Sequence, residues 1–119
     1  MKGILVLAAL TLTPILALAD ASGTWQATFD TQIGEQNYTY EFEIDGTKLT
    51  GLAKSANGEV EIQDGKVEGD TIMFVEHMSY QGMELEIIYT GKMVSDDEIA
   101  FTRNVGEFAT EELVAKRAE

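Results

Sequence analysis

Apolar and polar residues alternate along most of this chain, and this period of two constrains its fold more than any other feature. The clearest example is residues 37–45, NYTYEFEID, where every second residue is aromatic or aliphatic. Successive side chains of a β-strand point to opposite faces, so the alternation predicts strands with one buried and one solvated face. No window keeps a convincing helical stripe of apolar residues, and the chain is therefore predicted to be all-β.

A hairpin pattern occurs twice in the sequence. Residues 62–74 read IQDGKVEGDTIMF and residues 91–101 read GKMVSDDEIAF, and each runs Gly-Lys, an apolar residue, an acidic turn and then Ile-x-Phe. Further turn signals are Asp-Gly at 45–46 and Asn-Gly at 57–58, because glycine accepts the positive φ of tight hairpin turns. The repetition predicts a meander, in which each strand pairs with the next.

The turn signals divide the chain into about eight strands. They are predicted at 23–31, 37–45, 48–54, 60–62, 71–79, 83–94, 98–105 and 110–118, with residues 64–65 turning or kinking the chain before 66–68. About eight strands can close into a barrel that is filled by side chains or holds one small ligand. We therefore predict an antiparallel up-and-down barrel. Residues 110–119, TEELVAKRAE, also contain good helix formers, so a terminal helix is the alternative there.

The first 19 residues have the pattern of an export signal. Lys2 precedes an apolar run over residues 4–18, and Ala17-Leu18-Ala19 fits the small-x-small pattern of a cleavage site. An uncleaved membrane anchor is the alternative, but the run is shorter than the roughly 20 residues that a spanning helix needs. We predict a cleaved signal peptide at residues 1–19, a single β-barrel domain at residues 20–119, and a periplasmic or extracellular location.

The composition is strongly acidic. The chain has 8 Lys+Arg and 21 Asp+Glu, and removal of Lys2 with the signal leaves seven basic against 21 acidic residues, a formal charge of −14. Such a charge excludes the basic surface that nucleic acids require and disfavours anionic membranes, so neither is a predicted partner. The sequence contains no cysteine, so no disulfide or lipid-modified cysteine is available, and packing must stabilise the domain.

Two short motifs lie at the ends of the predicted domain: Gly23-Thr24-Trp25 and Arg117. The arrangement resembles that of the calycin group, which comprises lipocalins, fatty-acid-binding proteins and avidin-like barrels. The resemblance implies that Trp25 closes one end of the barrel and that Arg117 packs across its ring. The order GTW…DGTKLTG…EIQDGKVEGDTIMF…YTGKM…DEIAFTR…AKR is also similar to small secreted bacterial β-barrel domains of unassigned function, which implies a binding or accessory role.

The repeated hairpin predicts which side chains face the lumen. The Ile-x-Phe at residues 72–74 aligns with that at residues 99–101, and two residues further on Glu76 aligns with Arg103. A buried charge is costly unless it is paired, so we expect Glu76 and Arg103 to pair inside the barrel or to contact a polar ligand. The alternative places both side chains in water at the barrel mouth.

Aromatic side chains share the predicted inner face. Tyrosine has an apolar ring and one polar tip, so several tyrosines in one lumen could line a ligand pocket. The alternative is plain core packing, because the lumen of a small barrel can be filled by its own side chains. The candidate ligand-binding residues are Tyr38, Tyr40, Glu76, Tyr89, Phe101 and Arg103.

Signatures of catalysis and of metal binding are missing from the sequence. There is no cysteine nucleophile and no G-x-S-x-G motif, so no catalytic residue is assigned. His77 follows Glu76 on a strand, points to the opposite face and is expected at the surface. The acidic turns at 64–70 and 96–98 do not match the EF-hand spacing, so calcium is a minor alternative and no metal or cofactor is predicted.

The predicted function is binding of a small apolar or amphipathic ligand, or an accessory role beside extracellular enzymes. One alternative is an enzyme of isomerase or hydrolase type that uses Glu76, Arg103 and lumen tyrosines for acid–base chemistry. Another is a structural or protein-interaction module with a filled core. An internal cavity would favour binding or catalysis, and a filled lumen would favour the structural module.

Overall fold

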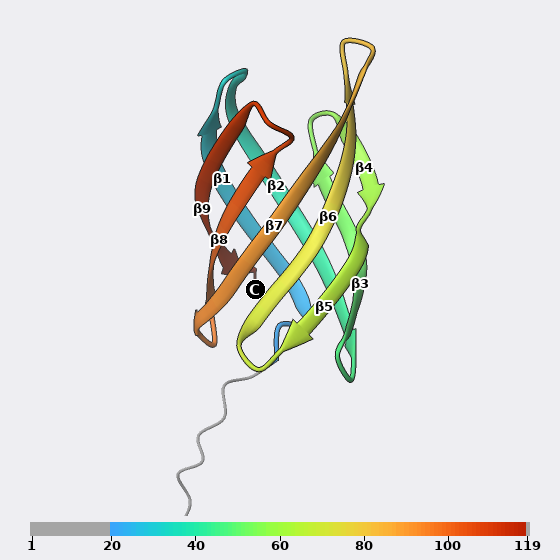
Figure 1. Cartoon of the computed structure of the whole chain (residues 1–119). Helices are drawn as coiled ribbons and strands as arrows, with labels where there is room; N and C mark the ends of the chain where they lie inside the picture. Colours follow the sequence, from blue (N-terminus) through green and yellow to red (C-terminus); the bar gives the residue numbers. More distant parts are fainter. Residues whose placement is uncertain (1–19, 119) are drawn as a thin grey trace, which may run out of the picture.

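Strands and tight turns follow one another without interruption and enclose a single core (Figure 1). The computed structural model describes residues 20–118, so the predicted signal peptide at residues 1–19 and the terminal Glu119 lie outside the described residues. The strands are β1 (Gly23–Thr31), β2 (Gly34–Asp45), β3 (Lys48–Ser55), β4 (Gly58–Glu61), β5 (Gln63–Glu68), β6 (Thr71–Tyr80), β7 (Met83–Ser95), β8 (Glu98–Val105) and β9 (Ala109–Arg117).

The strands form a closed barrel. They neighbour one another in the order β2-β1-β9-β8-β7-β6-β5-β3-β4, and an additional pairing of β2 with β3 closes the ring. All pairings are antiparallel. Because β4 and β5 pair with opposite ends of β3, they share one position in the wall and the barrel has eight positions. The predicted all-β, eight-stranded antiparallel barrel is confirmed.

A kink lies near the start of β5, shortly after the end of β4. Asp64 has a φ of 52°, and the register between β5 and β6 shifts between Gln63 and Lys66. Gly65 lies so close to the backbone of Leu49 that a Cβ atom would clash there. Of the two predicted roles for residues 64–65, the kink is therefore correct and the hairpin turn is wrong. The bulge bends one long wall segment without reversing it.

The structure also tests two further secondary-structure predictions, the last strand and the start of β2. Residues 109–117 form strand β9 and not a helix, because Leu113 and Ala115 bury one face of this segment against the core. Strand β2 begins at Gly34, which pairs with Thr31, and therefore starts earlier than the strand predicted at residues 37–45. Residues 20–118 contain no helix that is long and apolar enough to cross a membrane.

One end of the barrel is closed by Trp25. Its ring is fully buried, and its Nε1 donates a hydrogen bond to the carbonyl of Ala21 at 2.9 Å. The guanidinium of Arg117 lies 4.4 Å from the ring centroid, so the cation–π contact implied by the calycin resemblance is present. Strands β1 and β9 pair only near this end, at Trp25 with Arg117 and Gln26 with Lys116. The seam between them is therefore unpaired toward the other end.

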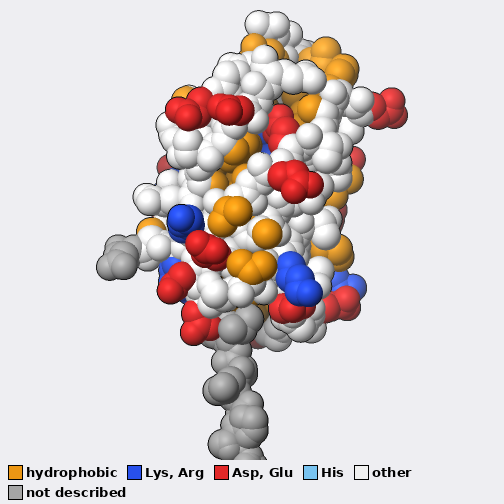
Figure 2. All heavy atoms as spheres, turned by 90° about the vertical axis from the view of Figure 1, so that its left-hand side faces the viewer, with side chains coloured by type: hydrophobic (Ala, Val, Ile, Leu, Met, Phe, Trp, Pro, Cys, Tyr) orange, Lys and Arg blue, Asp and Glu red, His pale blue; other side chains and the backbone are white. Residues whose placement is uncertain are grey.

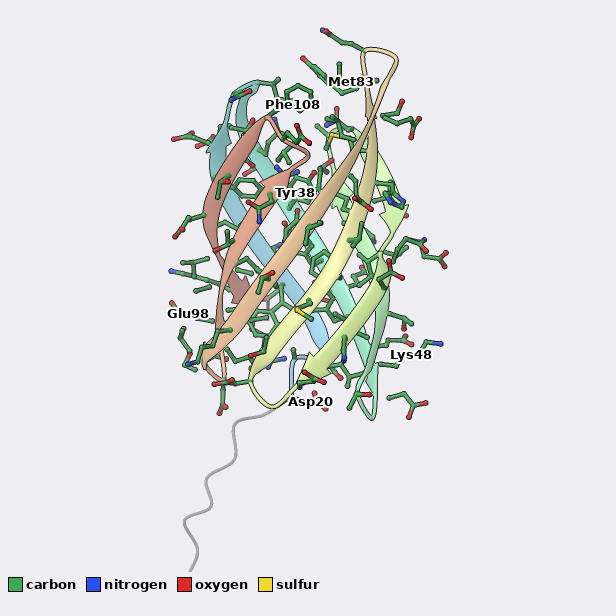
Figure 3. All side chains as sticks on the ribbon, viewed as in Figure 1. Asp20, Tyr38, Lys48, Met83, Glu98 and Phe108 are labelled. Carbon is green, nitrogen blue, oxygen red and sulfur yellow. The ribbon has the colours of Figure 1, made fainter. Side chains whose placement is uncertain are left out.

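The opposite end is open and is called the mouth here. Four hairpin turns lie at this end, and three of them, β1–β2, β6–β7 and β8–β9, border the opening; the fourth is the β3–β4 turn. Figure 3 shows Met83 and Phe108 at this end of the barrel and Asp20 at the other. Ile33, Met83 and Phe108, one from each turn that borders the opening, are exposed apolar side chains. The mouth thus carries an apolar rim, whereas the Trp25 end is packed.

Candidate functional site

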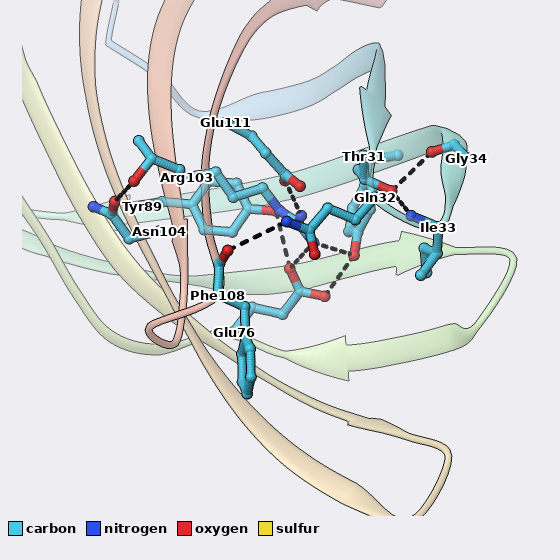
Figure 4. A network of polar contacts seen from close by, with 12 residues as sticks. Thr31, Gln32, Ile33, Gly34, Glu76, Tyr89, Arg103, Asn104, Phe108 and Glu111 are labelled. Carbon is cyan, nitrogen blue, oxygen red and sulfur yellow. Dashed lines mark hydrogen bonds and ion pairs between the residues drawn. The ribbon is translucent and has the colours of Figure 1, made fainter.

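A network of charged and phenolic side chains lies inside the barrel below the mouth (Figure 4). Arg103 and Glu76 are each about 3% exposed, and Arg103 Nη2 lies 3.7 Å from Glu76 Oε1. Arg103 also donates a hydrogen bond from Nη1 to Glu111 Oε1 at 2.6 Å. One guanidinium therefore faces two carboxylates, and the formal charge of the network is −1.

Two tyrosines join Arg103 to Glu76. Arg103 Nε donates to the Tyr89 hydroxyl at 2.8 Å, and its Nη2 donates to the Tyr38 hydroxyl at 2.9 Å. Each hydroxyl then donates to one oxygen of Glu76, Tyr38 at 2.8 Å and Tyr89 at 2.9 Å. Since the Tyr89 proton is used in this way, Tyr40 must donate in the 2.9 Å bond between the Tyr40 and Tyr89 hydroxyls. The network is a closed ring with a fixed donor order.

Strand pairing assembles this ring. Tyr89 on β7 and Glu111 on β9 are the direct register partners of Arg103 on β8. Glu76 comes from β6 and Tyr38 from β2 on the far wall, 65 residues from Arg103 in the sequence. The guanidinium carbon also lies 5.1–5.6 Å from the ring centroids of Phe29, Tyr38 and Tyr89. Arg103 is thus held by aromatic faces as well as by hydrogen bonds.

The environment keeps the tyrosines neutral and the arginine charged. Burial, followed by the charge of Glu76, raises the pKa of Tyr38 well above its usual range. Burial likewise raises the pKa values of Tyr40 and Tyr89. For Arg103, burial alone would lower the pKa, but Tyr89, Tyr38 and Glu76 more than offset it and the pKa lies above its usual range. Every phenol in the ring therefore remains a hydrogen-bond donor around neutral pH.

The free energy of unfolding is expected to fall steeply above pH 10. Unfolded tyrosines ionise with a pKa near 10, whereas Tyr38, Tyr40 and Tyr89 keep their protons in the folded state. Above that pH the folded state binds more protons than the unfolded state, so each tyrosine contributes a loss of about 1.4 kcal/mol per pH unit. Urea unfolding between pH 8 and pH 11.5 measures this slope. Tyr38→Phe removes one of the three tyrosines and should make this slope shallower by about 1.4 kcal/mol per pH unit. An unchanged slope in that variant would contradict the assignment.

Below the ring, the lumen is filled by aromatic packing. Tyr89 stacks on Phe74 with centroids 4.3 Å apart, and Phe101 meets Tyr89 edge-on at 5.6 Å. Tyr40 lies between Tyr38 and Phe42, with centroids 5.4 and 5.9 Å away. A Cβ atom at Gly91 would clash with the Phe101 ring, so the absent side chain makes room for this packing. These rings pack against one another and form the core of the lower lumen.

Above the ring, the mouth contains a pocket of about 270 Å³. We call it the mouth pocket. Arg103 and Glu111 supply its charged groups, and apolar side chains supply most of the rest. Gln32 Nε2 donates to the carbonyl of Phe108 at 3.3 Å, which ties the β1–β2 turn to the β8–β9 turn. The pocket is lined by Thr31, Gln32, Ile33, Gln36, Met78, Tyr80, Gln81, Met83, Leu85, Ile87, Arg103, Val105, Phe108, Ala109 and Glu111.

The fold is similar to that of several solved β-barrels. One redesigned β-barrel aligns with a TM-score of 0.57 and 16% identity over 82% of this chain and 91% of its own. A second redesigned barrel, mFAP1, solved bound to DFHBI, gives 0.55 and 13% over 82% and 94%. A point mutant of the fluorescent protein UnaG gives 0.50 and 16% over 83% and 96%. At these identities the likeness establishes a shared barrel fold. No protein-family model and no curated protein matches the chain.

The predicted site residues divide between two layers. Tyr38, Glu76, Tyr89 and Arg103 form the ring, Tyr40 adjoins it, and Phe101 lies in the packed aromatic layer. Of these six only Arg103 lines the mouth pocket, so the ligand-binding role assigned to the others remains a prediction. His77 lies on the outer face, where its Nε2 is 3.7 Å from Glu86. No group of three or more acidic or histidine side chains within residues 20–118 could hold a metal ion.

Sequence reasoning missed Glu111 and the apolar lining of the pocket. Glu111 lies two residues before Leu113, which shares its face of β9, so its inward direction was available from the same alternation. Its meeting with Arg103 follows from the β8–β9 register. The turn residues Gln32, Ile33 and Phe108 gave no such signal, because alternation does not extend into turns.

Proposed function

We propose that this protein is a small-molecule carrier or sensor that binds an amphipathic ligand in the mouth pocket. The observation that carries the proposal is the apolar pocket of about 270 Å³ with a charged pair, Arg103 and Glu111, at its inner side. Ligand sites are typically concave, mostly apolar and provided with a few polar groups that orient the ligand. The exposed apolar rim formed by Ile33, Met83 and Phe108 gives an apolar ligand a path from the surface.

The other two functions find less support. Glu76 is within hydrogen-bond reach of two tyrosines but does not line the pocket, so a ligand there would not touch the group expected to act as acid or base. The aromatic layer fills only the lower lumen, and a purely structural module has no need of a pocket above a charged pair. The observed geometry therefore favours binding over catalysis or a filled scaffold.

We further propose that the protein acts outside the cytoplasm and that it has the architecture of the calycin barrels. The support is the export pattern at residues 1–19 and the Trp25–Arg117 closure shared with that group. The redesigned barrel mFAP1, solved bound to DFHBI, is an example of a ligand-binding barrel of similar fold. Cell fractionation with an antibody to the native protein, together with mass determination of its N-terminus, tests the location and cleavage after Ala19.

A pocket-filling variant tests the binding function. Val105→Trp places an indole in the mouth pocket without removing a member of the ring, and we expect it to abolish ligand binding while the fold persists. Native mass spectrometry of protein purified from its own host measures any retained ligand. Val94→Trp is the matched control, since Val94 is exposed on the outer face of β7. Equal retention by the Val105→Trp and Val94→Trp proteins would contradict the mouth pocket as the site.

A further inference from the structure

The charge balance of the mouth pocket restricts the ligand further. We infer that the polar end of the ligand is a hydrogen-bond-donating cation, such as a primary ammonium, that pairs with Glu111, and that carboxylate amphiphiles bind more weakly. This inference rests on the proposed binding function and specifies its ligand class.

The positive charge of Arg103 is already compensated. Its guanidinium donates to Glu111 and to two phenol oxygens, and it lies 3.7 Å from Glu76. An anionic ligand would have to displace the Glu111 bond and would leave two carboxylates close to its own charge. Like charges in a partly desolvated site repel strongly, so an anion gains little from Arg103.

One carboxylate oxygen of Glu111 is accessible from the mouth pocket. Its bond to Arg103 uses Oε1, and the contacts found within residues 20–118 give Oε2 no partner. Every buried side-chain oxygen in this part of the chain has a hydrogen-bond partner, so an oxygen without a partner is not buried. Since the Glu111 side chain is about 10% exposed and lines the pocket, Oε2 is the accessible oxygen. It is an acceptor at the inner side of an otherwise apolar pocket, which is the complement of an ammonium on an alkyl or aryl body.

The negative charge of the protein surface also favours a cationic ligand. Figure 2 shows acidic side chains scattered over the face on the β1–β9 side, with few basic ones among them. The formal charge of the whole chain is −13. A field of this sign raises the local concentration of cations at the mouth and lowers that of anions.

A matched series of ligands tests the inference. Binding of decylamine, 1-decanol and decanoate at pH 7.5 is measured by calorimetry below their micelle concentrations, with NMR shifts locating the site. We expect decylamine to bind at least about tenfold more tightly than decanoate, because only the amine compensates the negative charge that Glu111 adds to the network. Decanoate binding as tightly as decylamine would overturn the ligand class while preserving the pocket. Failure of all three to bind would overturn the proposed function itself.

Two variants separate the pocket from the acidic surface. Glu111→Gln removes the accepting carboxylate, and the preference for amine over acid should shrink to within roughly threefold. Glu112→Gln removes the same charge from the adjacent exposed position on β9 and should leave the preference unchanged. Amine binding that is equally strong in Val105→Trp would be adsorption to the surface and would overturn the inference. Thermal melts and one-dimensional NMR verify that each variant is folded.

Discussion

Replacing Arg103 by methionine is expected to lower the free energy of unfolding by about 3–5 kcal/mol, because it leaves two carboxylates in the barrel without their common partner. Glu76 is buried on all sides, and its only cationic neighbour within 4 Å among residues 20–118 is Arg103. Such a loss is a large fraction of the stability of a domain of this size. Urea unfolding followed by tryptophan fluorescence measures it, since Trp25 is the single tryptophan.

A double variant tests whether uncompensated charge causes the loss of stability. Adding Glu76→Gln removes one uncompensated charge and should recover about 1 kcal/mol or more relative to Arg103→Met alone. Lys92→Met is the matched control, because the side chain of Lys92 is 68% exposed and its loss should change stability by less than about 0.5 kcal/mol. An Arg103→Met protein as stable as the Lys92→Met protein would contradict the buried charge pair.

Replacing Trp25 by alanine is expected to cost about 3–5 kcal/mol, since it empties the packed end of the barrel. The ring is fully buried, its Nε1 is bonded to Ala21, and Arg117 covers one face. The loss also removes a contact at the short region where β1 and β9 pair, so the seam should open first. Chemical unfolding followed by far-UV circular dichroism measures the stability, and hydrogen exchange of the β9 amides reports on the seam.

Arg117→Met tests the contribution of the arginine to this closure separately from that of the Trp25 indole. Arg117 donates hydrogen bonds to the carbonyls of Asp20, Ser22 and Asp96 as well as covering Trp25. Its removal leaves the ring in place and should cost about 1–2 kcal/mol, less than the loss of Trp25. Val114→Ala on the outer face of β9 is the surface control. A larger effect from Arg117→Met than from Trp25→Ala would show that the arginine and not the ring closes the barrel.

Local sequence patterns predicted most of the fold. Alternation over residues 37–45 identified the inner face of β2, and its aromatic members at positions 38, 40 and 42 are all buried. The repeated hairpin placed Glu76 and Arg103 on the inner face, where the structure has them. These inferences succeed because a strand has an exact period of two, so one known inward residue fixes its neighbours. Turn residues are less regular, and for this reason the start of β2 and the role of residues 64–65 were misjudged.

The sequence by itself determined that this chain is an antiparallel barrel of acidic composition, with Glu76 and Arg103 on the same phase of their strands as the inward Ile-x-Phe residues. That these two charges are buried and lie close together was decided by the tertiary structure. Only the tertiary structure decided that the aromatic side chains fill the lower lumen, that Glu111 joins Arg103, and that the space for a ligand lies at the mouth. The reason is that alternation assigns a side chain to a face but gives no distance across the barrel. Whether rings from β2 and β7 touch or leave a pocket depends on how the closed sheet curves.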